Sequence, residues 1–129
     1  MKKISLLTYI IFHISNLLLI ILYIYPGSIL GWLIYGNIQK QPQITSDFII
    51  SSNHIYAFLI LSTFGLFSYY NKNIKILFSY LFFISIFLEF LHYVIPQRSF
   101  EYKDLFGNFL GVLIVFLLFK INKSFERNL

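Results

Sequence analysis

The sequence predicts an all-α, polytopic membrane protein in which four transmembrane helices form a compact bundle. Of its 129 residues, 58% are hydrophobic and only 12% are charged, whereas soluble chains average about 45–50% and about 25%. Four apolar runs each approach the length of about 20 residues that a helix needs to cross a bilayer. Barrel strands would be about 10 residues long with alternating polarity, so these longer runs favour helices.

The first apolar run covers residues 4–25. It is too long for the apolar part of a signal peptide, and no small-residue cleavage site follows it. We therefore expect an uncleaved first span that ends at the helix-breaking pair Pro26-Gly27. Residues 29–35 are apolar but too short to cross, and the rings of Trp32 and Tyr35 suit the headgroup level. We expect an interfacial turn or a short re-entrant stretch there, followed by a solvated loop over residues 36–47.

Three further runs predict a second span over residues 52–70, a third over 74–95 and a fourth over 105–121. The turn Asn71-Lys72-Asn73 is so short that the second and third spans must form an antiparallel hairpin. Pro96 is expected to end the third span, and Asp104 is predicted to be the N-cap of the fourth. The length suits a single domain over residues 1–129.

The basic residues predict the orientation, because cytoplasmic loops carry an excess of Lys and Arg. One side receives Lys2, Lys3, Lys72, Lys75, Lys120, Lys123 and Arg127, and the other receives Lys40, Arg98 and Lys103. We therefore expect both termini in the cytoplasm. This distribution also explains the net charge of +5 without nucleic-acid binding. The absence of cysteine excludes disulfides, thiol nucleophiles and thiolate metal sites.

Polar residues gather at the opposite, outer end of the predicted spans. His54 opens the second span, Glu89 and His92 lie near the end of the third, Arg98 lies in the link, and Asp104 and Asn108 open the fourth. Polar groups in or near hydrocarbon are costly, so this cluster is the candidate functional site. Glu89 lies six residues before Ile95, about 9 Å from the predicted helix end. A carboxylate there needs a partner or a proton, and His92 shares its helix face.

Each member of the cluster also has a purely structural interpretation. Glu89 can be one half of a packing ion pair, Asp104 a helix cap, and Arg98 a side chain that extends to water. Arg98 is otherwise expected to pair with Glu89 or Asp104, or to hold an anionic headgroup. The catalytic candidates are Glu89, His92 and His54, and the ligand-binding candidates are Arg98, Asp104, Asn108 and His54. One Glu-x-x-His pair does not repeat as it does in di-metal bundles. His54, Asp104 and Asn108 could complete a mononuclear site, but nothing in the spacing demands it, so we expect no metal and no other cofactor.

Small residues predict where helices approach one another closely. Gly107 and Gly111 form a GxxxG pair, which we expect to press the fourth span onto the second or third. Gly65 lies on a face of small residues in the second span. His13 and Asn16, in the middle of the first span, are expected to form interhelical hydrogen bonds.

The segment 89–111, EFLHYVIPQRSFEYKDLFGNFLG, resembles the signature of the VanZ-like family of small bacterial membrane proteins. That signature joins a Glu near a helix end, a Pro-x-Arg-Ser/Thr-Phe link and an Asp-x-x-x-Asn-x-x-Gly opening of the last span. Ser52-Asn53-His54 is similar to the start of the family's His-containing span. The chain departs from the pattern in having Ile50-Ser51 where an acidic–basic pair is common, and His92 where many members have Gln.

The resemblance implies a multi-pass protein of the bacterial cytoplasmic (inner) membrane, in a family named after a member associated with low-level resistance to teicoplanin. Together with the cluster, it favours a cell-envelope protein that binds an anionic lipid or a lipid-linked wall precursor. One alternative is an intramembrane enzyme acting on a lipid headgroup, with Glu89 as general base. Another is a scaffold subunit, and a homo-oligomer or a membrane-protein partner is left open. A transporter is less favoured because the polar residues do not continue across the membrane.

Overall fold

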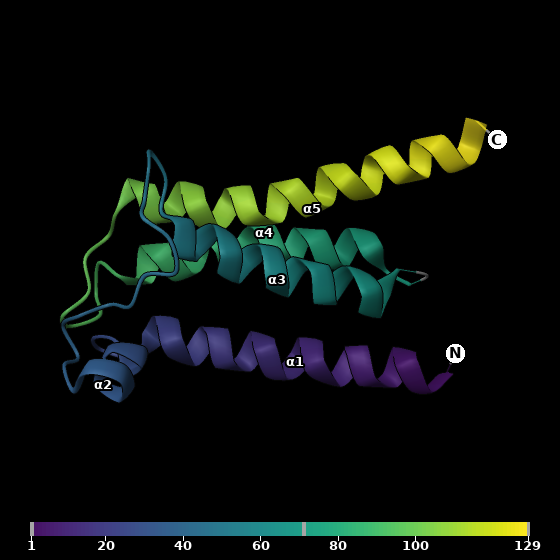
Figure 1. The fold of residues 1–129 in the computed structure, drawn as a ribbon. Helices are drawn as coiled ribbons and strands as arrows, with labels where there is room; N and C mark the ends of the chain where they lie inside the picture. The colour runs from purple at the N-terminus through teal and green to yellow at the C-terminus, as the bar shows by residue number, and fades with distance from the viewer. Residues whose placement is uncertain (1, 71, 129) are drawn as a thin grey trace.

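The computed structural model describes residues 2–70 and 72–128, which form five helices and no strand. The helices are α1 (Lys2–Ile24), α2 (Ile29–Tyr35), α3 (Ser52–Tyr69), α4 (Ile74–Leu91) and α5 (Tyr102–Asn128). Figure 1 shows the four long helices side by side, with both chain ends at one end of the bundle and α2 with the long loops at the other. The predicted all-α class is therefore confirmed.

α3 lies at the centre of the packing and contacts α1, α4 and α5. Its contact with α5 is the most extensive, and α1 also packs against α4. The buried apolar core comes from all four long helices and includes Phe12, Phe58, Leu61, Leu81, Leu88 and Val112. Ser62 and Ser85 are fully buried within the same core, so the interior combines large side chains with small ones that allow close approach.

Glycines set the distance between α3 and α5. A Cβ atom added at Gly111 would lie 2.6 Å from the Ile55 carbonyl oxygen and 2.9 Å from the Leu59 nitrogen. One added at Gly107 would lie 2.7 Å from the Ser51 carbonyl oxygen. Both glycines therefore lie directly on the backbone of α3. Gly65 of α3 instead meets side-chain atoms of α1 and α4.

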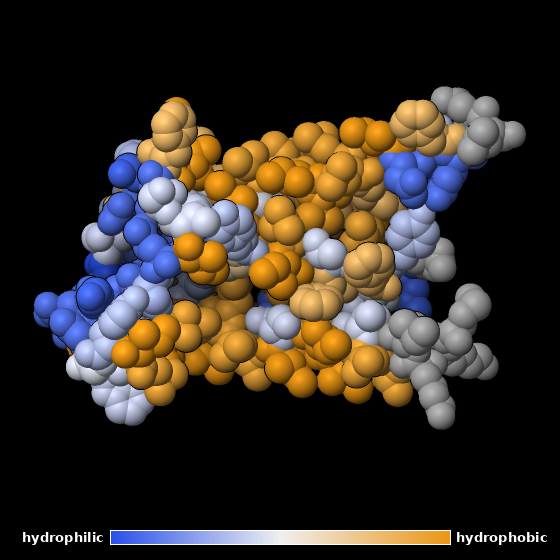
Figure 2. Space-filling view, viewed as in Figure 1, coloured by the Kyte–Doolittle hydropathy of each residue, from blue (hydrophilic) through white to orange (hydrophobic). Residues whose placement is uncertain are grey.

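Within the described residues, three helices are long and apolar enough to cross a membrane, by length and composition. These candidate spans are Leu6–Ile24, Ile74–Leu91 and Tyr102–Arg127. Figure 2 shows apolar side chains over the middle of the bundle on the face in view and hydrophilic ones at the end where the loops lie. Exposed apolar side chains on the long helices include Leu17, Phe67 and Phe83, and an apolar surface this extensive is unusual for a soluble protein. We conclude that the bundle is a membrane protein.

Three expected boundaries require correction. α4 ends at Leu91 rather than residue 95, so Glu89 is two residues from the helix end instead of six. α5 begins at Tyr102, which places Asp104 inside the first helical turn; its prediction as N-cap is therefore wrong. α5 also continues to Asn128, beyond the predicted end at residue 121. Of the predicted turn Asn71-Lys72-Asn73, Asn71 lies outside the described residues.

The polar pair in the middle of α1 forms the interhelical bonds that the sequence predicts. His13 Nε2 lies 3.1 Å from the Tyr69 hydroxyl of α3, and Asn16 Nδ2 donates to the Tyr80 hydroxyl of α4 at 2.6 Å. These bonds join α1 to α3 and to α4.

Candidate functional site

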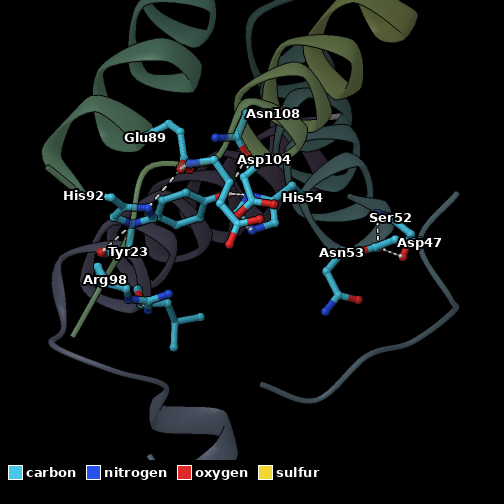
Figure 3. A network of polar contacts seen from close by, with 12 residues as sticks. Tyr23, Asp47, Ser52, Asn53, His54, Glu89, His92, Arg98, Asp104 and Asn108 are labelled. Atoms are coloured by element: carbon cyan, nitrogen blue, oxygen red, sulfur yellow. Dashed lines mark hydrogen bonds and ion pairs between the residues drawn. The ribbon is translucent and has the colours of Figure 1, made fainter. Parts of the chain in front are cut away.

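The polar residues of the candidate site meet where α1 and α4 end and where α3 and α5 begin (Figure 3). Glu89 and Asn108 are 0% exposed, His92 is 3% exposed and His54 is 7% exposed. Antiparallel helices bring their opposite ends to the same face, which explains why residues so distant in sequence become neighbours. Sequence alone predicted this convergence and placed His92 beside Glu89, but it did not predict the other partners described below.

Asn108 fixes the orientation and tautomer of His54. The Asn108 Nδ2 amide donates to the Ser85 carbonyl of α4 at 3.1 Å, so its Oδ1 must face the other way. That oxygen lies 2.9 Å from His54 Nδ1 and accepts from the Tyr23 hydroxyl at 2.5 Å. Because an amide oxygen only accepts, Nδ1 of His54 carries a proton. Asn108 is thus enclosed by protein partners and positions His54.

Glu89 and His92 form a buried pair at the end of α4. His92 Nδ1 lies 3.2 Å from Glu89 Oε1, and His92 Nε2 lies 3.2 Å from the Tyr23 carbonyl oxygen. The backbone N–H of Glu101 donates to the same Glu89 Oε1 at 3.1 Å. Among the described residues, the other carboxylate oxygen, Oε2, has no hydrogen-bond partner. This is unusual for a buried carboxylate.

Asp104 approaches His54 from the first turn of α5. Its Oδ2 lies 3.4 Å from His54 Nε2. Asp104 is partly exposed, unlike Glu89, and lines a cavity. Both acidic residues of the cluster are therefore matched with histidines, Glu89 with His92 and Asp104 with His54.

Arg98 does not form the predicted ion pair with Glu89 or Asp104. In the described residues its Nη2 donates to the Leu22 carbonyl at 2.7 Å and its Nε donates to the Tyr25 carbonyl at 3.2 Å. The last carbonyls of a helix lack partners within it, so α1 offers acceptors that Arg98 can reach. Burial lowers the pKa of the Arg98 guanidinium, and the charges of Glu89 and Asp104 oppose that shift. An arginine nevertheless stays charged.

Two cavities adjoin the cluster and share Ser28, Gln41, His92 and Arg98 in their walls. The first, of about 380 Å³, lies among α1, α2, α3 and the loop that follows α2, and its walls are mainly apolar. The second, of about 300 Å³, has mostly polar walls that include Gln97, Ser99 and Asp104. Arg98 thus stands between an apolar compartment and a polar one.

Tyr23 is the site residue that sequence reasoning missed. Its hydroxyl lies between His54 and Asn108, and its ring stacks on the His92 ring at 5.6 Å with an interplanar angle of 15°. A single signal pointed to it: Tyr23 is an aromatic residue with a polar tip, at the end of α1 that meets the cluster.

The loop before α3 has a separate, structural role. Asp47 Oδ1 accepts from the Ser52 N–H at 2.8 Å, which satisfies one of the unpaired donors at the start of α3. Asn53 binds the loop through the Pro42 carbonyl and the Ile44 N–H. Figure 3 shows Asp47, Ser52 and Asn53 to one side of the main cluster.

These features define a small helical membrane protein with a buried polar site at one end of its bundle. Comparison with protein families is consistent with this description: the model of the VanZ/LLP1 family matches residues 8–123. The match covers most of the chain, which therefore belongs to the VanZ/LLP1 family. No curated protein and no solved structure matches the chain.

Proposed function

We propose that this VanZ/LLP1 protein crosses the bacterial cytoplasmic membrane four times, with both termini in the cytoplasm, and binds an anionic lipid at its outer face. α3 would supply the fourth crossing beside the three apolar spans. Its 18 residues equal the length of α4, and both chain ends lie at the same end of the bundle (Figure 1). The excess of basic residues at that end supports a cytoplasmic location.

The observation that carries the binding proposal is the pair of adjoining cavities. One is lined by Leu19, Leu22, Leu30, Ile34 and Ile60, among others, and suits hydrocarbon. The other is lined by amide, hydroxyl and charged groups and suits a hydrated headgroup. Arg98, Ser28 and His92 lie in the walls of both. A molecule that has a charged head and a long apolar tail matches this arrangement.

Arg98 supplies the recognition of negative charge. Two of its N–H donors hold the carbonyls of α1, which fixes the plane of the guanidinium. In the described chain the remaining N–H donors have no protein acceptor and can bind phosphate oxygens. Fixing the side chain beforehand reduces the entropy lost on binding. In this proposal Arg98, with Asp104 and His54 beside it, faces the headgroup, while Asn108 acts indirectly by holding His54.

The test is lipid retention by the protein in mixed-lipid nanodiscs, measured by native mass spectrometry. With equal amounts of phosphatidylglycerol and phosphatidylcholine, we expect the wild-type protein to retain phosphatidylglycerol selectively. Arg98→Gln should abolish that selectivity. Lys103→Gln is the matched control, because Lys103 is an exposed basic residue at the same end that lines neither cavity. Equal retention by wild type and Arg98→Gln would contradict the proposal.

The apolar cavity provides an independent test. Ala57 lies in its wall, so Ala57→Phe should narrow the space for an acyl chain and weaken the binding of polyprenyl phosphate. Binding of inorganic phosphate should change little. A role in glycopeptide resistance, expected from the family resemblance, would on this proposal act through the same pocket, because lipid-linked wall precursors also join a phosphate group to a long apolar chain.

The second candidate function is an intramembrane enzyme acting on a lipid headgroup. It is favoured by one observation, the buried Glu89 carboxylate with an unpartnered oxygen beside His92. Such a group can accept a proton as a general base. Glu89→Gln keeps the side-chain shape and removes that capacity. Full cellular function in Glu89→Gln, with unchanged lipid retention, would exclude the enzyme and leave the binding protein.

A further inference from the structure

We propose that His54, Glu89 and Asp104 form a binding site for one divalent transition-metal ion, with Zn²⁺ or Mn²⁺ as its class of ligand. The three side chains come from α3, α4 and α5. One ligand atom of each lies within 4.8 Å of the other two. The sequence pattern alone predicts no metal, because a single Glu-x-x-His pair does not specify a site. The fold brings Glu89 to a different histidine, His54, and to Asp104.

The unpartnered oxygen of Glu89 is the first observation for a ligand. Glu89 is 0% exposed, and its Oε1 already has the Glu101 N–H and His92 near it. Oε2 has no hydrogen-bond partner in the described residues. A buried carboxylate oxygen left without a donor is costly, and a cation bound at Oε2 would remove that cost.

The contacts of the His54 ring are the second observation. Its Nδ1 carries a proton because it faces Asn108 Oδ1. In the neutral ring Nε2 therefore presents a lone pair toward Asp104 Oδ2, 3.4 Å away. Two acceptors at that distance repel each other unless a proton or a metal ion lies between them. Ligand atoms on a tetrahedral ion with bonds of about 2.0 Å are about 3.3 Å apart, which matches this separation.

The residues around the three ligands provide the outer support that metal sites need. A metal-binding histidine commonly donates its other N–H to an oxygen acceptor, which fixes the ring. Asn108 provides that acceptor for His54, and Ser85 in turn fixes Asn108. His92 and the Glu101 N–H hold Glu89 in the same way. Both buried ligands are thus oriented by partners of their own.

The donor set selects the class of metal. One imidazole with two carboxylates suits Zn²⁺ or Mn²⁺ better than Mg²⁺ or Ca²⁺, which prefer oxygen alone, or Cu⁺, which prefers sulfur. Three protein ligands leave at least one coordination position open. Asp104 lies in the wall of the polar cavity with Arg98, so the metal site adjoins the region where the proposed headgroup would bind. The metal site itself stands without the lipid proposal.

The experiment measures metal binding by the full-length protein in dodecyl maltoside, free of phospholipid and phosphate. After removal of metals with a chelator, ZnCl₂ or MnCl₂ is added, and the bound ion is counted by inductively coupled plasma mass spectrometry. We expect about one ion per chain. Glu89→Gln and Asp104→Asn should each weaken binding by at least about 100-fold, the upper end of the effect of outer-shell changes. Glu126→Gln is the matched control, since it removes an exposed carboxylate near the other end of α5, away from the trio, and should leave binding unchanged.

A spectroscopic measurement keeps the proposal testable if a variant fails to fold. Pulsed electron paramagnetic resonance of the wild-type Mn²⁺ complex should show coupling to one imidazole nitrogen. That coupling should persist in His13→Gln, since His13 lies in the middle of α1 on Tyr69. A wild-type protein that binds no stoichiometric ion, a bound Mn²⁺ without nitrogen coupling, or variants of the trio with wild-type affinity would each overturn the proposal. None of these results would affect lipid selectivity through Arg98, so failure of one proposal is distinguishable from failure of the other.

Discussion

The contact between α3 and α5 should be the most sensitive part of the bundle to a single added methyl group. In Gly111→Ala, the new Cβ would lie 2.6 Å from the Ile55 carbonyl oxygen and 2.9 Å from the Phe58 Cβ. Ordinary contact begins at 3.4 Å, so α5 must move away from α3 by about 0.8 Å. The neighbouring atoms belong to backbone or to a fully buried side chain, and they cannot rotate aside.

The expected cost follows from that displacement. A gap of about 0.5–1 Å forfeits about a quarter to a half of the dispersion attraction between facing atoms. Overpacking of a close-packed interior typically costs about 1–3 kcal/mol. We expect Gly111→Ala to lower the free energy of unfolding by an amount within that range. Because α5 carries Asn108 and Asp104, the same displacement should also loosen the site around His54.

Gly65→Ala is the matched control, since it adds the same methyl group to a helix of the same bundle. Its new Cβ would meet the ends of two side chains, Phe12 Cε2 at 2.9 Å and Leu77 Cδ1 at 3.0 Å. Such groups can shift at a cost of about 0.5–1.5 kcal/mol. Both variants gain the same intrinsic helix preference of alanine over glycine, so their difference isolates packing against backbone.

The assay is reversible unfolding of the purified protein in mixed micelles, followed by circular dichroism as sodium dodecyl sulfate is increased. Gly111→Ala should unfold at a clearly lower denaturant fraction than Gly65→Ala. If the two variants unfold together, or if Gly65→Ala is the less stable, the conclusion that glycine sets the α3–α5 distance is refuted.

Three further outcomes are expected. Tyr23→Phe removes the hydroxyl that donates to Asn108 and should lower the free energy of unfolding by about 1 kcal/mol; an unchanged unfolding midpoint would contradict this. Asp47→Ala removes the side-chain cap of α3 and should cost about 0.5–2 kcal/mol, with faster amide hydrogen exchange confined to the first turn of α3. Because the chain lacks cysteine, single introduced cysteines report topology. In intact cells, Ser99→Cys should react with an impermeant maleimide and Lys72→Cys should not. Reaction of both variants, or of neither, would exclude the proposed orientation.

Much of the fold could be predicted because hydropathy and helix length are properties of continuous segments. The helix ends could not be placed in the same way. Pro96 marks a position that no helix passes easily, but α4 stops earlier, at Leu91. There the backbone N–H of His92 donates to the Glu89 and Phe90 carbonyls and tightens the last turn. Backbone hydrogen bonds of this kind can form at any residue, so an apolar sequence does not show where they end a helix.

The candidate site shows the same division. Alternation of the spans predicted that His54, Glu89 and Asp104 would converge, and they do. Because opposite charges attract, the sequence also made Arg98 the expected partner of the two carboxylates. Arg98 instead satisfies carbonyls at the end of α1. Every residue carries a backbone carbonyl, so the amino-acid sequence does not show which carbonyls lack a hydrogen-bond partner.

The capping of α1 by Arg98 also constrains how the protein is made. The acceptors at Leu22 and Tyr25 precede their donor by 76 and 73 residues. At a synthesis rate of about 5–20 residues per second, Arg98 leaves the ribosome on the order of 4–15 seconds after the end of α1. During this interval water or lipid must occupy those acceptors. The end of α1 is therefore capped, and the pocket assembled, only when the link between α4 and α5 has been made. A nascent chain arrested before that link would have an uncapped α1 and no pocket.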